Sequence, residues 1–407
     1  MHNPMRPLLL VLALLSMGSQ ECTHVQSQGR AFFSPAHLDN PPLRRLLEDF
    51  DRFMADTLAR AGVPGAAVVI VYDTAVVFQR GYGLRRLGAS DSVDAHTVFR
   101  IGSLSKGFAG VLAGLLVREE RLCWDDGVRS YVPEFTLNPP TYAAQVQLAH
   151  LLAHTTGLPY HAYTNLIEAG HDLRTIAQRF AHFRVKHRPG EVYAYQNAAF
   201  ALVGEMMHVA TGKPFGELLR ERIFKPIGMS QASTDRHTML AAANIAWPHE
   251  HTRAGFRPVP ITARYYNAVP AGGVNASAAD MGRWLLALLG NRPDVVPPEV
   301  LDEVFRPRVR TDGERRYSHL WGQHVVPYYG LGWRILAGEA DTIVYHGGYV
   351  NHYRSEIALD RRRRIGICVL FNTPTPVAGI AIPTFWQMYR EREEAIQMAA
   401  ERAASQP

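Results

Sequence analysis

The sequence is poor in cysteine, on which small stapled proteins depend. Cys22, Cys123 and Cys368 are its only cysteines in 407 residues, too few and too far apart for a disulfide framework or a metal site. We expect them to be buried apolar side chains, while export would permit a disulfide. With 47% apolar and 20% charged residues, the composition also excludes a disordered chain and a collagen-like one. The length suits one large domain or two coupled lobes.

Long apolar runs are missing too, since no stretch reaches the roughly 20 residues that cross a bilayer as a helix. The apolar run Leu8–Leu15 follows a segment with one arginine and precedes small residues, which is typical of an export signal. We therefore expect residues 1–19 to be a signal peptide, residues 20–41 a polar tail, and the mature protein to be periplasmic or secreted. No membrane span is expected.

Charge of one sign is not in large excess, because the net charge is only +6. The sizeable basic block, Arg361–Arg364, has no interleaved aromatic residues, so nucleic acid is not an expected partner. We expect this block to be a solvated hairpin tip. Lysine is rare: only four of the 43 basic residues are lysines. A desolvated lysine can lose its proton and arginine cannot, so a lysine near a nucleophile is informative here.

Strand patterns lie toward both ends of the chain. Near the N-terminus, a helical pattern at residues 43–61 precedes a hairpin of Ala66–Tyr72 and Val76–Tyr82. Further strands are predicted near the C-terminus at Thr342–Tyr345, His352–Leu359 and Ile365–Phe371. A helix at Phe385–Ala404 is expected to cover one face of the sheet.

Helical patterns dominate the middle of the chain. They cover Ala198–Thr211, a helix opened by Pro214 and running to about Phe224, and Ser277–Leu289, while residues 246–273 look irregular. The expected fold is α/β (α+β), an antiparallel sheet flanked by helices and built from both termini, with a mostly helical inserted lobe. We assign residues 42–120 and 321–405 to the α/β lobe and 121–320 to the helical lobe, and expect a ligand between them.

Ser103 and Lys106 lie three residues apart, ahead of an apolar helical pattern. On a helix, residues at this spacing share a face. At the helix N-terminus, the dipole would stabilise negative charge on the serine and on a bound oxyanion. Desolvation would lower the pKa of the lysine, which could then accept the serine proton. By itself the pattern favours an N-capping serine and a surface lysine.

Two further patterns change that balance. Tyr195 and Asn197 are two apart in an expected loop just before a helix, so their side chains could reach one cleft. The simpler interpretation is packing by the tyrosine and capping by the asparagine. His346 precedes Gly347 and Gly348 on an expected strand, where missing side chains permit the close approach of another group such as a substrate, or a β-bulge.

In this order the three patterns resemble the motifs of the serine β-lactamase and penicillin-recognising family. The Y-x-N middle motif is similar to the class C branch, with its carboxypeptidase, D-aminopeptidase and esterase relatives. The resemblance runs from about residue 45 to 390, and four more stretches support it: His150–Pro159, Ala271–Ala276, Asp280–Trp284 and Tyr329–Trp333.

The resemblance implies a role for each residue. Ser103 would attack the acyl carbon and form an acyl-enzyme that water hydrolyses. Lys106 and Tyr195 would share the proton transfers, and which of them is the base stays open. Asn197 would orient Lys106 and the substrate amide. The backbone N–H groups of Ser103 and Tyr349 would form the oxyanion hole. No metal or organic cofactor is implied, and we expect a monomer acting on a small molecule or peptide.

The third motif departs from the β-lactamase pattern, in which lysine and threonine usually hold the positions of His346 and Gly347. A histidine is mostly neutral at pH 7 and glycine has no hydroxyl, so anchoring of a substrate carboxylate is in doubt. Gly348 matches the third position of that family motif. Arg354 is a possible substitute anchor, or else part of an ion pair at the sheet edge. Asn372 matches a family position near that carboxylate.

These observations predict an exported serine hydrolase acting on an amide or ester, a β-lactam or a related compound. The alternatives are a D-alanyl carboxypeptidase, D-aminopeptidase or esterase, and a penicillin-binding or peptidoglycan-sensing module without turnover. His150 and His154 have the spacing of zinc ligands on a helix, but Leu151 stands where a zinc protease needs glutamate, so a structural role is expected. No G-x-S-x-G elbow or phosphate-binding glycine loop occurs.

Overall fold

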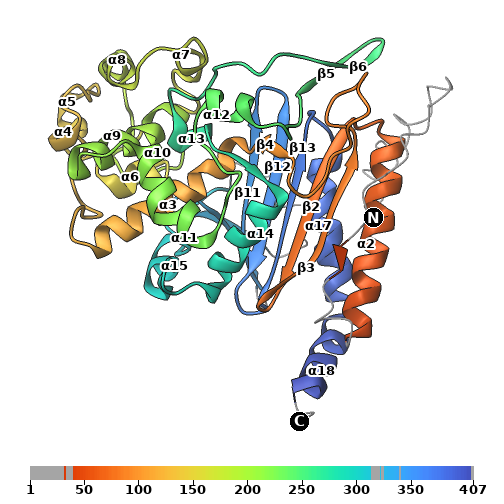
Figure 1. Ribbon diagram of the computed structural model, residues 1–407. Helices are drawn as coiled ribbons and strands as arrows, with labels where there is room; N and C mark the ends of the chain where they lie inside the picture. Colours follow the sequence, from red (N-terminus) through yellow and green to blue (C-terminus); the bar gives the residue numbers. More distant parts are fainter. Residues whose placement is uncertain (1–31, 34–39, 313–320, 322–324, 339–340, 405–407) are drawn as a thin grey trace, which may run out of the picture.

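The computed structural model describes residues 32–33, 40–312, 321, 325–338 and 341–404. The expected signal peptide and Cys22 lie outside these residues, as does most of the expected tail. The fold is a nine-stranded antiparallel sheet between two layers of helices (Figure 1). Its strand order is β1-β3-β2-β13-β12-β11-β10-β9-β8. In the described part of the chain, no helix is both long enough and apolar enough to cross a membrane.

Strands from the N-terminal and C-terminal parts of the chain pair in the middle of the sheet, where β13 lies beside β2. Every residue of both strands is buried, as expected for β-branched and apolar runs between two helical layers. The predicted sheet built from both termini is therefore confirmed. Its main strands are β2 (Gly65–Tyr72), β3 (Ala75–Gly83), β11 (Thr342–Val350), β12 (Tyr353–Asp360) and β13 (Ile365–Phe371).

The short strands toward the two edges of the sheet were not predicted, because two to four residues carry too little periodicity. They are β1 (Phe32–Phe33), β8 (Val309–Arg310), β9 (Val326–Tyr329) and β10 (Arg334–Ala337). Two separate ribbons add β4 (Val98–Arg100) with β7 (Asn275–Ser277), and β5 (His249–Thr252) with β6 (Gly255–Pro258). The β5–β6 hairpin and a helical turn lie within the segment that we expected to be irregular.

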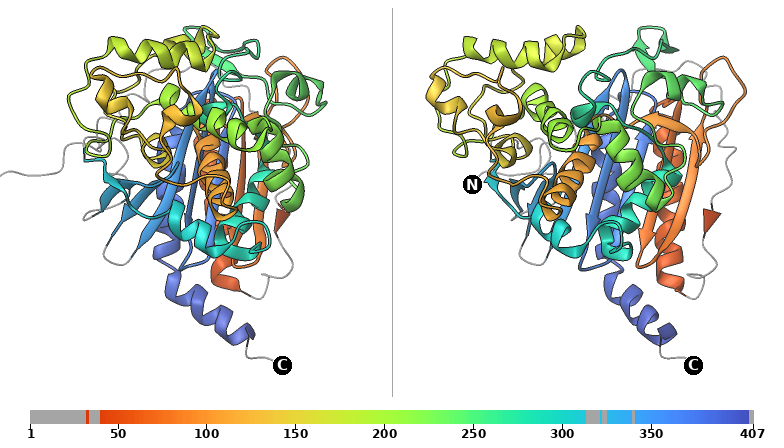
Figure 2. Two further views of the ribbon diagram at one scale, coloured as in Figure 1. Left: turned by 90° about the vertical axis from the view of Figure 1, so that its left-hand side faces the viewer. Right: turned by 60° about the vertical axis from the view of Figure 1, so that its left-hand side comes forward.

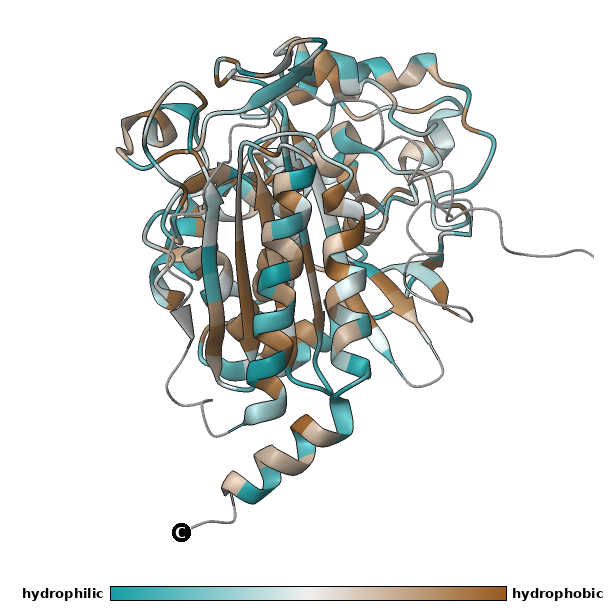
Figure 3. Cartoon of the chain, turned by 90° about the vertical axis from the view of Figure 1, so that its right-hand side faces the viewer, coloured by the Kyte–Doolittle hydropathy of each residue, from teal (hydrophilic) through white to brown (hydrophobic). Residues whose placement is uncertain are grey.

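Helices α2 (Pro41–Arg60) and α17 (Val377–Arg390) cover one face of the sheet (Figure 3). Asn40 caps α2, because its Oδ1 accepts a hydrogen bond of 3.0 Å from the N–H of Leu43. The single C-terminal helix predicted at 385–404 is wrong: α17 begins earlier, and α18 (Glu393–Ala404) follows after a break. Helix α18 contacts α2 and extends beyond the body of the molecule (Figure 1).

The opposite face is covered by the mostly helical middle of the chain (Figure 2). Helices α3 (Ser105–Arg118) and α9 (Asn197–Thr211) lie in this layer, and α14 (Ala278–Leu286) packs directly on β2 and β13. Short elements complete the layer: α4 (Val128–Tyr131), α5 (Pro140–Ala143), α6 (Leu148–Leu152), α7 (Thr164–Glu168), α8 (Leu173–Arg179), α10 (Phe215–Leu219), α11 (Lys225–Ile227), α12 (Arg236–Ala241), α13 (Val269–Gly272), α15 (Pro298–Val304), η2 (Gly102–Leu104), η3 (Phe180–His182), η4 (Arg220–Phe224) and η5 (Ala287–Asn291).

The cysteines behave differently from one another. Cys368 on β13 is fully buried, which confirms the expectation for that residue. Cys123 is exposed, so the same expectation is wrong there. Both are free thiols, and they do not form a disulfide with each other.

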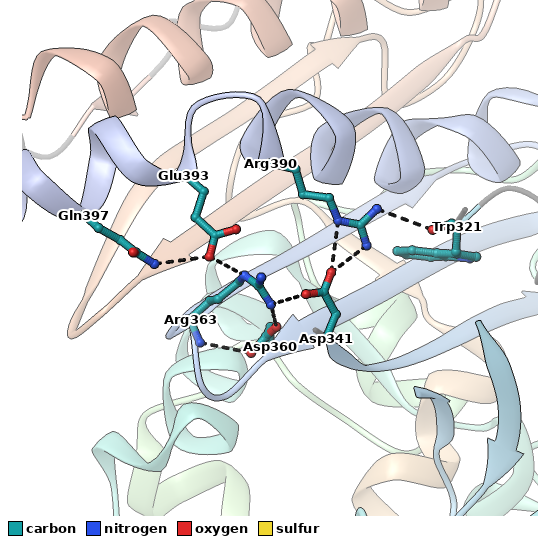
Figure 4. A network of polar contacts seen from close by, with 7 residues as sticks. All are labelled: Trp321, Asp341, Asp360, Arg363, Arg390, Glu393 and Gln397. Carbon is teal, nitrogen blue, oxygen red and sulfur yellow. Dashed lines mark hydrogen bonds and ion pairs between the residues drawn. The ribbon is translucent and has the colours of Figure 1, made fainter. Parts of the chain in front are cut away.

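The basic block after β12 is only partly a solvated tip. The side chain of Arg363 is 8% exposed and contacts Asp341 at 2.5 Å, Asp360 at 2.9 Å and Glu393 at 2.7 Å (Figure 4). These contacts tie the β12–β13 turn to the start of α18. The expectation of a solvated tip is wrong for Arg363, because three carboxylates from separate parts of the chain draw its guanidinium inward.

We expect Arg363→Met to lower the free energy of unfolding by about 3 kcal/mol, because it leaves three carboxylates close together without their shared cation. Chemical denaturation of both proteins measures the difference. Arg362→Met, one residue away on the exposed side of the same turn, is the matched control and should change stability by less than about 0.5 kcal/mol. Equal effects of the two substitutions would contradict this account of the turn.

Candidate active site

Ser103 lies in the tight turn η2 that leads from β4 into α3. Gly102 before it has φ +52°, and a Cβ there would lie 2.8 Å from the backbone nitrogen of Tyr349. The turn therefore packs against strand β11, and the backbones beside Ser103 and Tyr349 come together. The predicted oxyanion hole would need both N–H groups at one place.

Gly348 explains how η2 can approach β11 so closely. A Cβ at this position would lie 2.2 Å from the carbonyl oxygen of Ile101, and that oxygen accepts a hydrogen bond of 2.7 Å from Ser355 Oγ. The absence of a side chain at Gly348 thus makes room for the protein's own backbone at Ile101, and not for a substrate. The register between β11 and β12 is continuous through this pair of glycines.

Lys106 is one turn after Ser103 and is fully buried. Its Nζ lies 3.2 Å from Ser103 Oγ, 2.8 Å from Asn197 Oδ1 and 2.7 Å from the carbonyl oxygen of Ala271. Burial and, secondarily, the positive charge of Arg334 lower the pKa of Lys106 well below its ordinary value. A neutral amine has two N–H groups and one lone pair. The two carbonyl-type oxygens can take the N–H groups, which leaves the lone pair for the Ser103 hydroxyl.

Asn197 is the first residue of α9, but its side chain does not cap the helix. Its Oδ1 accepts from Lys106, and its Nδ2 donates a hydrogen bond of 3.0 Å to the hydroxyl of Tyr265. The preceding residue, Gln196, is held in place because its backbone N–H donates to Nδ1 of the buried His154 at 3.1 Å. These contacts orient the middle motif toward the helix that carries Ser103 and Lys106.

Tyr195 is buried beside the nucleophile. The centre of its ring lies 4.8 Å from Lys106 Nζ. Burial raises the pKa of Tyr195, while the nearby Ser103 and the charge of Arg334 act in the opposite direction. The phenol is therefore protonated at neutral pH.

The motifs converge on one pocket of about 650 Å³. Of the residues predicted to serve the site, Lys106 lies behind the pocket wall, and Gly348 and Asn372 do not line it. The lining residues are Ser103, Tyr160, His161, Thr164, Glu168, Tyr195, Asn197, Tyr265, Arg334, His346, Gly347, Tyr349 and Arg354.

His346 is an uncharged side chain that lines this pocket. The residue is 1% exposed, and its Nδ1 lies 2.8 Å from the carbonyl oxygen of Gly347 and its Nε2 3.0 Å from the hydroxyl of Tyr329. Burial, followed by the charges of Arg334 and Lys106, lowers the pKa of His346 well below its ordinary value. The third motif consequently supplies no cation.

The space beside Gly347 is filled by a carboxylate from the neighbouring strand. A Cβ on Gly347 would lie 2.8 Å from Glu356 Oε2, and Glu356 Oε1 is 2.5 Å from the guanidinium of Arg354. Both predicted roles of Arg354 are thus compatible with its position, since it lines the pocket and forms an ion pair within the sheet. Burial raises the pKa of Glu356 to about 7.

Asn372, which was predicted to bind substrate, lies away from the pocket lining. It is fully buried at the end of β13, where Nδ2 donates to the carbonyl oxygens of Leu84 at 3.1 Å and Arg85 at 3.3 Å. These bonds fasten the end of β13 to the segment after β3. The structure does not bring Asn372 to the pocket.

Sequence reasoning missed several pocket residues. Tyr265 lies in the proline-rich segment and Arg334 at the start of a four-residue strand, so neither had a local signal. The supporting stretch at Ala271–Ala276 did contain a sequence signal for the site, because the Ala271 carbonyl oxygen accepts a hydrogen bond from Lys106. Among the described lining residues, Glu168 is the single carboxylate. Burial and, secondarily, the charge of Glu168 raise the pKa of Tyr265.

The pair His150 and His154 has structural contacts. His150 Nδ1 accepts from the N–H of Gln147 at 3.2 Å and caps α6, and His154 packs 4.3 Å from the ring of Tyr195. Within the described ranges, no three His, Cys, Asp or Glu side chains lie together as a metal site would require.

Comparison with known proteins agrees with this geometry. A family model described as Beta-lactamase matches residues 50–384. The chain is 26% identical over 324 residues to Unguisins hydrolase ungD' of Aspergillus campestris, covering 77% of this chain and 59% of that protein. It is 23% identical over 332 residues to Protein flp of Staphylococcus aureus, covering 80% and 63%. The chain thus spans about three fifths of the length of these curated relatives.

A solved structure shares the fold. The octameric penicillin-binding protein homologue from Pyrococcus abyssi superposes with a TM-score of 0.72 at 25% identity, over 85% of this chain and 76% of that one. The family model spans most of the sequence, and the structural match covers most of this chain. The chain therefore belongs to the beta-lactamase family and has its mixed α/β serine hydrolase fold.

Proposed function

We propose that this protein hydrolyses an amide or ester through a covalent acyl-enzyme on Ser103. One observation carries the proposal: Lys106 Nζ lies 3.2 Å from Ser103 Oγ and 2.8 Å from Asn197 Oδ1, although about ninety residues separate the two motifs. A serine hydroxyl, an amine, a phenol and an amide are then close enough to act together at one site, as nucleophilic catalysis requires.

In the proposed acylation, Ser103 Oγ attacks the carbonyl carbon while Lys106 accepts the hydroxyl proton. The substrate carbonyl π bond opens, and the resulting oxyanion lies between the N–H groups of Ser103 and Tyr349. When the tetrahedral intermediate collapses, the bond to the leaving group breaks, and that group takes a proton from Tyr195 or Lys106. Water then repeats the sequence on the acyl-enzyme and releases the acid.

The pKa directions support Lys106 as the base. Burial lowers the pKa of Lys106 well below its ordinary value and so favours its neutral amine, whereas a raised pKa keeps Tyr195 as a proton donor. In this proposal Tyr195 relays the proton to the leaving group.

The finer assignments are proposals as well. We propose a class C-like enzyme, because the middle motif is Tyr195-Gln196-Asn197, and an exported monomer whose α/β lobe (42–120, 321–405) and helical lobe (121–320) both contribute pocket residues. A penicillin-binding module without turnover is the second candidate. The structural neighbour named as a penicillin-binding protein homologue favours it.

Intact-mass spectrometry tests the proposal. The protein is mixed separately with a chromogenic cephalosporin, a D-alanyl-D-alanine peptide and a short-chain nitrophenyl ester, and product release is followed in parallel. We expect a transient adduct of acyl mass and turnover with at least one compound. A stable adduct without product would favour the binding module, and absence of both adduct and product with all three would refute the proposal.

A further inference from the structure

His154 is a buried side chain that the proposed mechanism does not use. It is 0% exposed, and its backbone has φ +58°. Few residues other than glycine adopt this left-handed conformation, although histidine and asparagine adopt it more readily than most. Such a conformation persists only where the surrounding structure holds it. The position of His154 is therefore determined by its contacts.

The backbone on both sides of Tyr195 is bonded to His154. The N–H of Ala194 donates a hydrogen bond of 2.9 Å to the carbonyl oxygen of His154, and the N–H of Gln196 donates one of 3.1 Å to Nδ1 of its ring. The carbonyl oxygen of Tyr195 accepts a third, of 2.8 Å, from the N–H of His161. These bonds fix the backbone that carries the phenol, and His154 accepts two of the three.

The ring of His154 also packs on the phenol ring. The two ring centres are 4.3 Å apart, and the rings of Tyr329 at 4.8 Å and Phe200 at 5.1 Å lie close to the same imidazole. These neighbours limit rotation of the imidazole. A rotation that broke its bond to Gln196 would also disturb its packing on Tyr195.

The imidazole acts as an acceptor because it stays neutral. Nδ1 accepts from a backbone N–H, so the ring proton is on Nε2. Burial, followed by the charges of Lys106 and His346, lowers the pKa of His154 well below its ordinary value. A protonated ring would carry a proton on Nδ1 and could not accept from Gln196. The bond to the middle motif is therefore kept at neutral pH.

We infer that His154 is a positioning residue, which holds the Tyr195 hydroxyl where it can give its proton to the leaving group. This inference rests on the proposed function and adds a residue that does not itself line the pocket. The step concerned is the one in which the bond from the acyl carbon to the leaving oxygen breaks and that oxygen takes the phenol proton. A displacement of about 1 Å can cost about 100-fold in rate. Loss of Nδ1 should therefore slow this step more than a step that needs no proton.

Two esters of one acid test the inference. Phenyl butanoate and 4-nitrophenyl butanoate give the same acyl-enzyme, but 4-nitrophenolate leaves readily without a proton, whereas the more basic phenolate benefits from one. His154→Phe keeps a ring and removes Nδ1. It should lower kcat/KM by at least about 10-fold for the phenyl ester and by less than about 3-fold for the nitrophenyl ester. His154→Asn should keep both rates within about 3-fold, because its Oδ1 can replace Nδ1 and asparagine tolerates the left-handed backbone.

Hydrogen exchange followed by mass spectrometry gives a second readout that does not depend on turnover. The backbone amide of Gln196 should exchange at least about 10-fold faster in His154→Phe than in the unsubstituted protein, and His154→Asn should restore most of the protection. If His154→Phe does not fold, His154→Gln replaces it in both measurements, because the glutamine amide reaches toward the position of Nε2 and not of Nδ1.

His150→Phe is the matched control. His150 Nδ1 likewise accepts from a backbone N–H, that of Gln147 at 3.2 Å, but it does so at the start of α6. The control should leave the ratio of the two ester rates and the exchange of Gln196 unchanged. Equal losses with both esters, unchanged exchange of Gln196 in His154→Phe, or the same changes in His150→Phe would overturn the inference. Failure of the proposed function shows separately, as an unsubstituted protein that gives neither adduct nor product with these esters, the cephalosporin or the peptide.

Discussion

Ser103→Ala is expected to lower kcat/KM for every hydrolysed amide or ester by at least about 10⁴-fold, because no other group can form the acyl bond. The substitution removes only one oxygen atom. The contacts of Lys106 with Asn197 and Ala271 remain, because they do not involve the serine. Steady-state rates with the most active of the three test compounds measure the loss. Intact-mass spectra should show no adduct.

The control for this substitution is Ser130→Ala, which removes the same atom at an exposed position in α4. It should retain full activity. Thermal unfolding of both variants should match that of the unsubstituted protein within a few degrees, which separates lost chemistry from lost folding. If Ser103→Ala keeps its activity, the acyl-enzyme proposal is wrong.

Lys106→Met is expected to lower kcat/KM by about 10³-fold, the size of effect that a positioned general base contributes. Methionine fills similar space but cannot accept the Ser103 proton. It also leaves Asn197 Oδ1 and the Ala271 carbonyl without their shared donor, so unfolding must be measured in parallel. Lys213→Met is the matched control, because that lysine is on the surface, 2.6 Å from Glu221, and its loss should not change the rate.

The pH dependence shows whether Lys106 is the base. The rate should rise with pH as Lys106 loses its proton, and the rise should end well below the ordinary value of 10.5, because burial and Arg334 both disfavour the charged form. Arg334→Met removes a nearby positive charge, so the pKa of Lys106 should rise and the ascending limb should move to higher pH. An unchanged limb in Arg334→Met, or the same limb in Lys106→Met, would show that another group titrates.

The local part of the site could be predicted from the sequence. Ser103 and Lys106 are one helical turn apart, so their proximity follows from helix geometry once α3 forms. Tyr195 and Asn197 were placed together by the same kind of short-range argument. That the two pairs meet is a tertiary result, produced by packing of α3 and α9 against α13 and by the hydrogen bond from Gln196 to His154.

Roles that depend on contacts across space could not be predicted residue by residue. Asn372 matches a family position near the substrate, yet the carbonyl oxygens of Leu84 and Arg85 take up its amide. Arg363 was expected in solvent and is held by three carboxylates. Apart from Asp360, which is three residues from Arg363, these partners are far away in sequence, and no local pattern predicts them.

The amino-acid order by itself determined the family motifs, the strands at both ends and the presence of a nucleophile with a neighbouring amine. Each of these depends on residues within one or two turns of each other or on the alternation of apolar side chains. Only the tertiary structure decided that Tyr265 and Arg334 belong to the pocket and that Gly348 makes room for the Ile101 carbonyl. Such features depend on burial and on distances between separate segments, because desolvation and charge act through space and not along the chain.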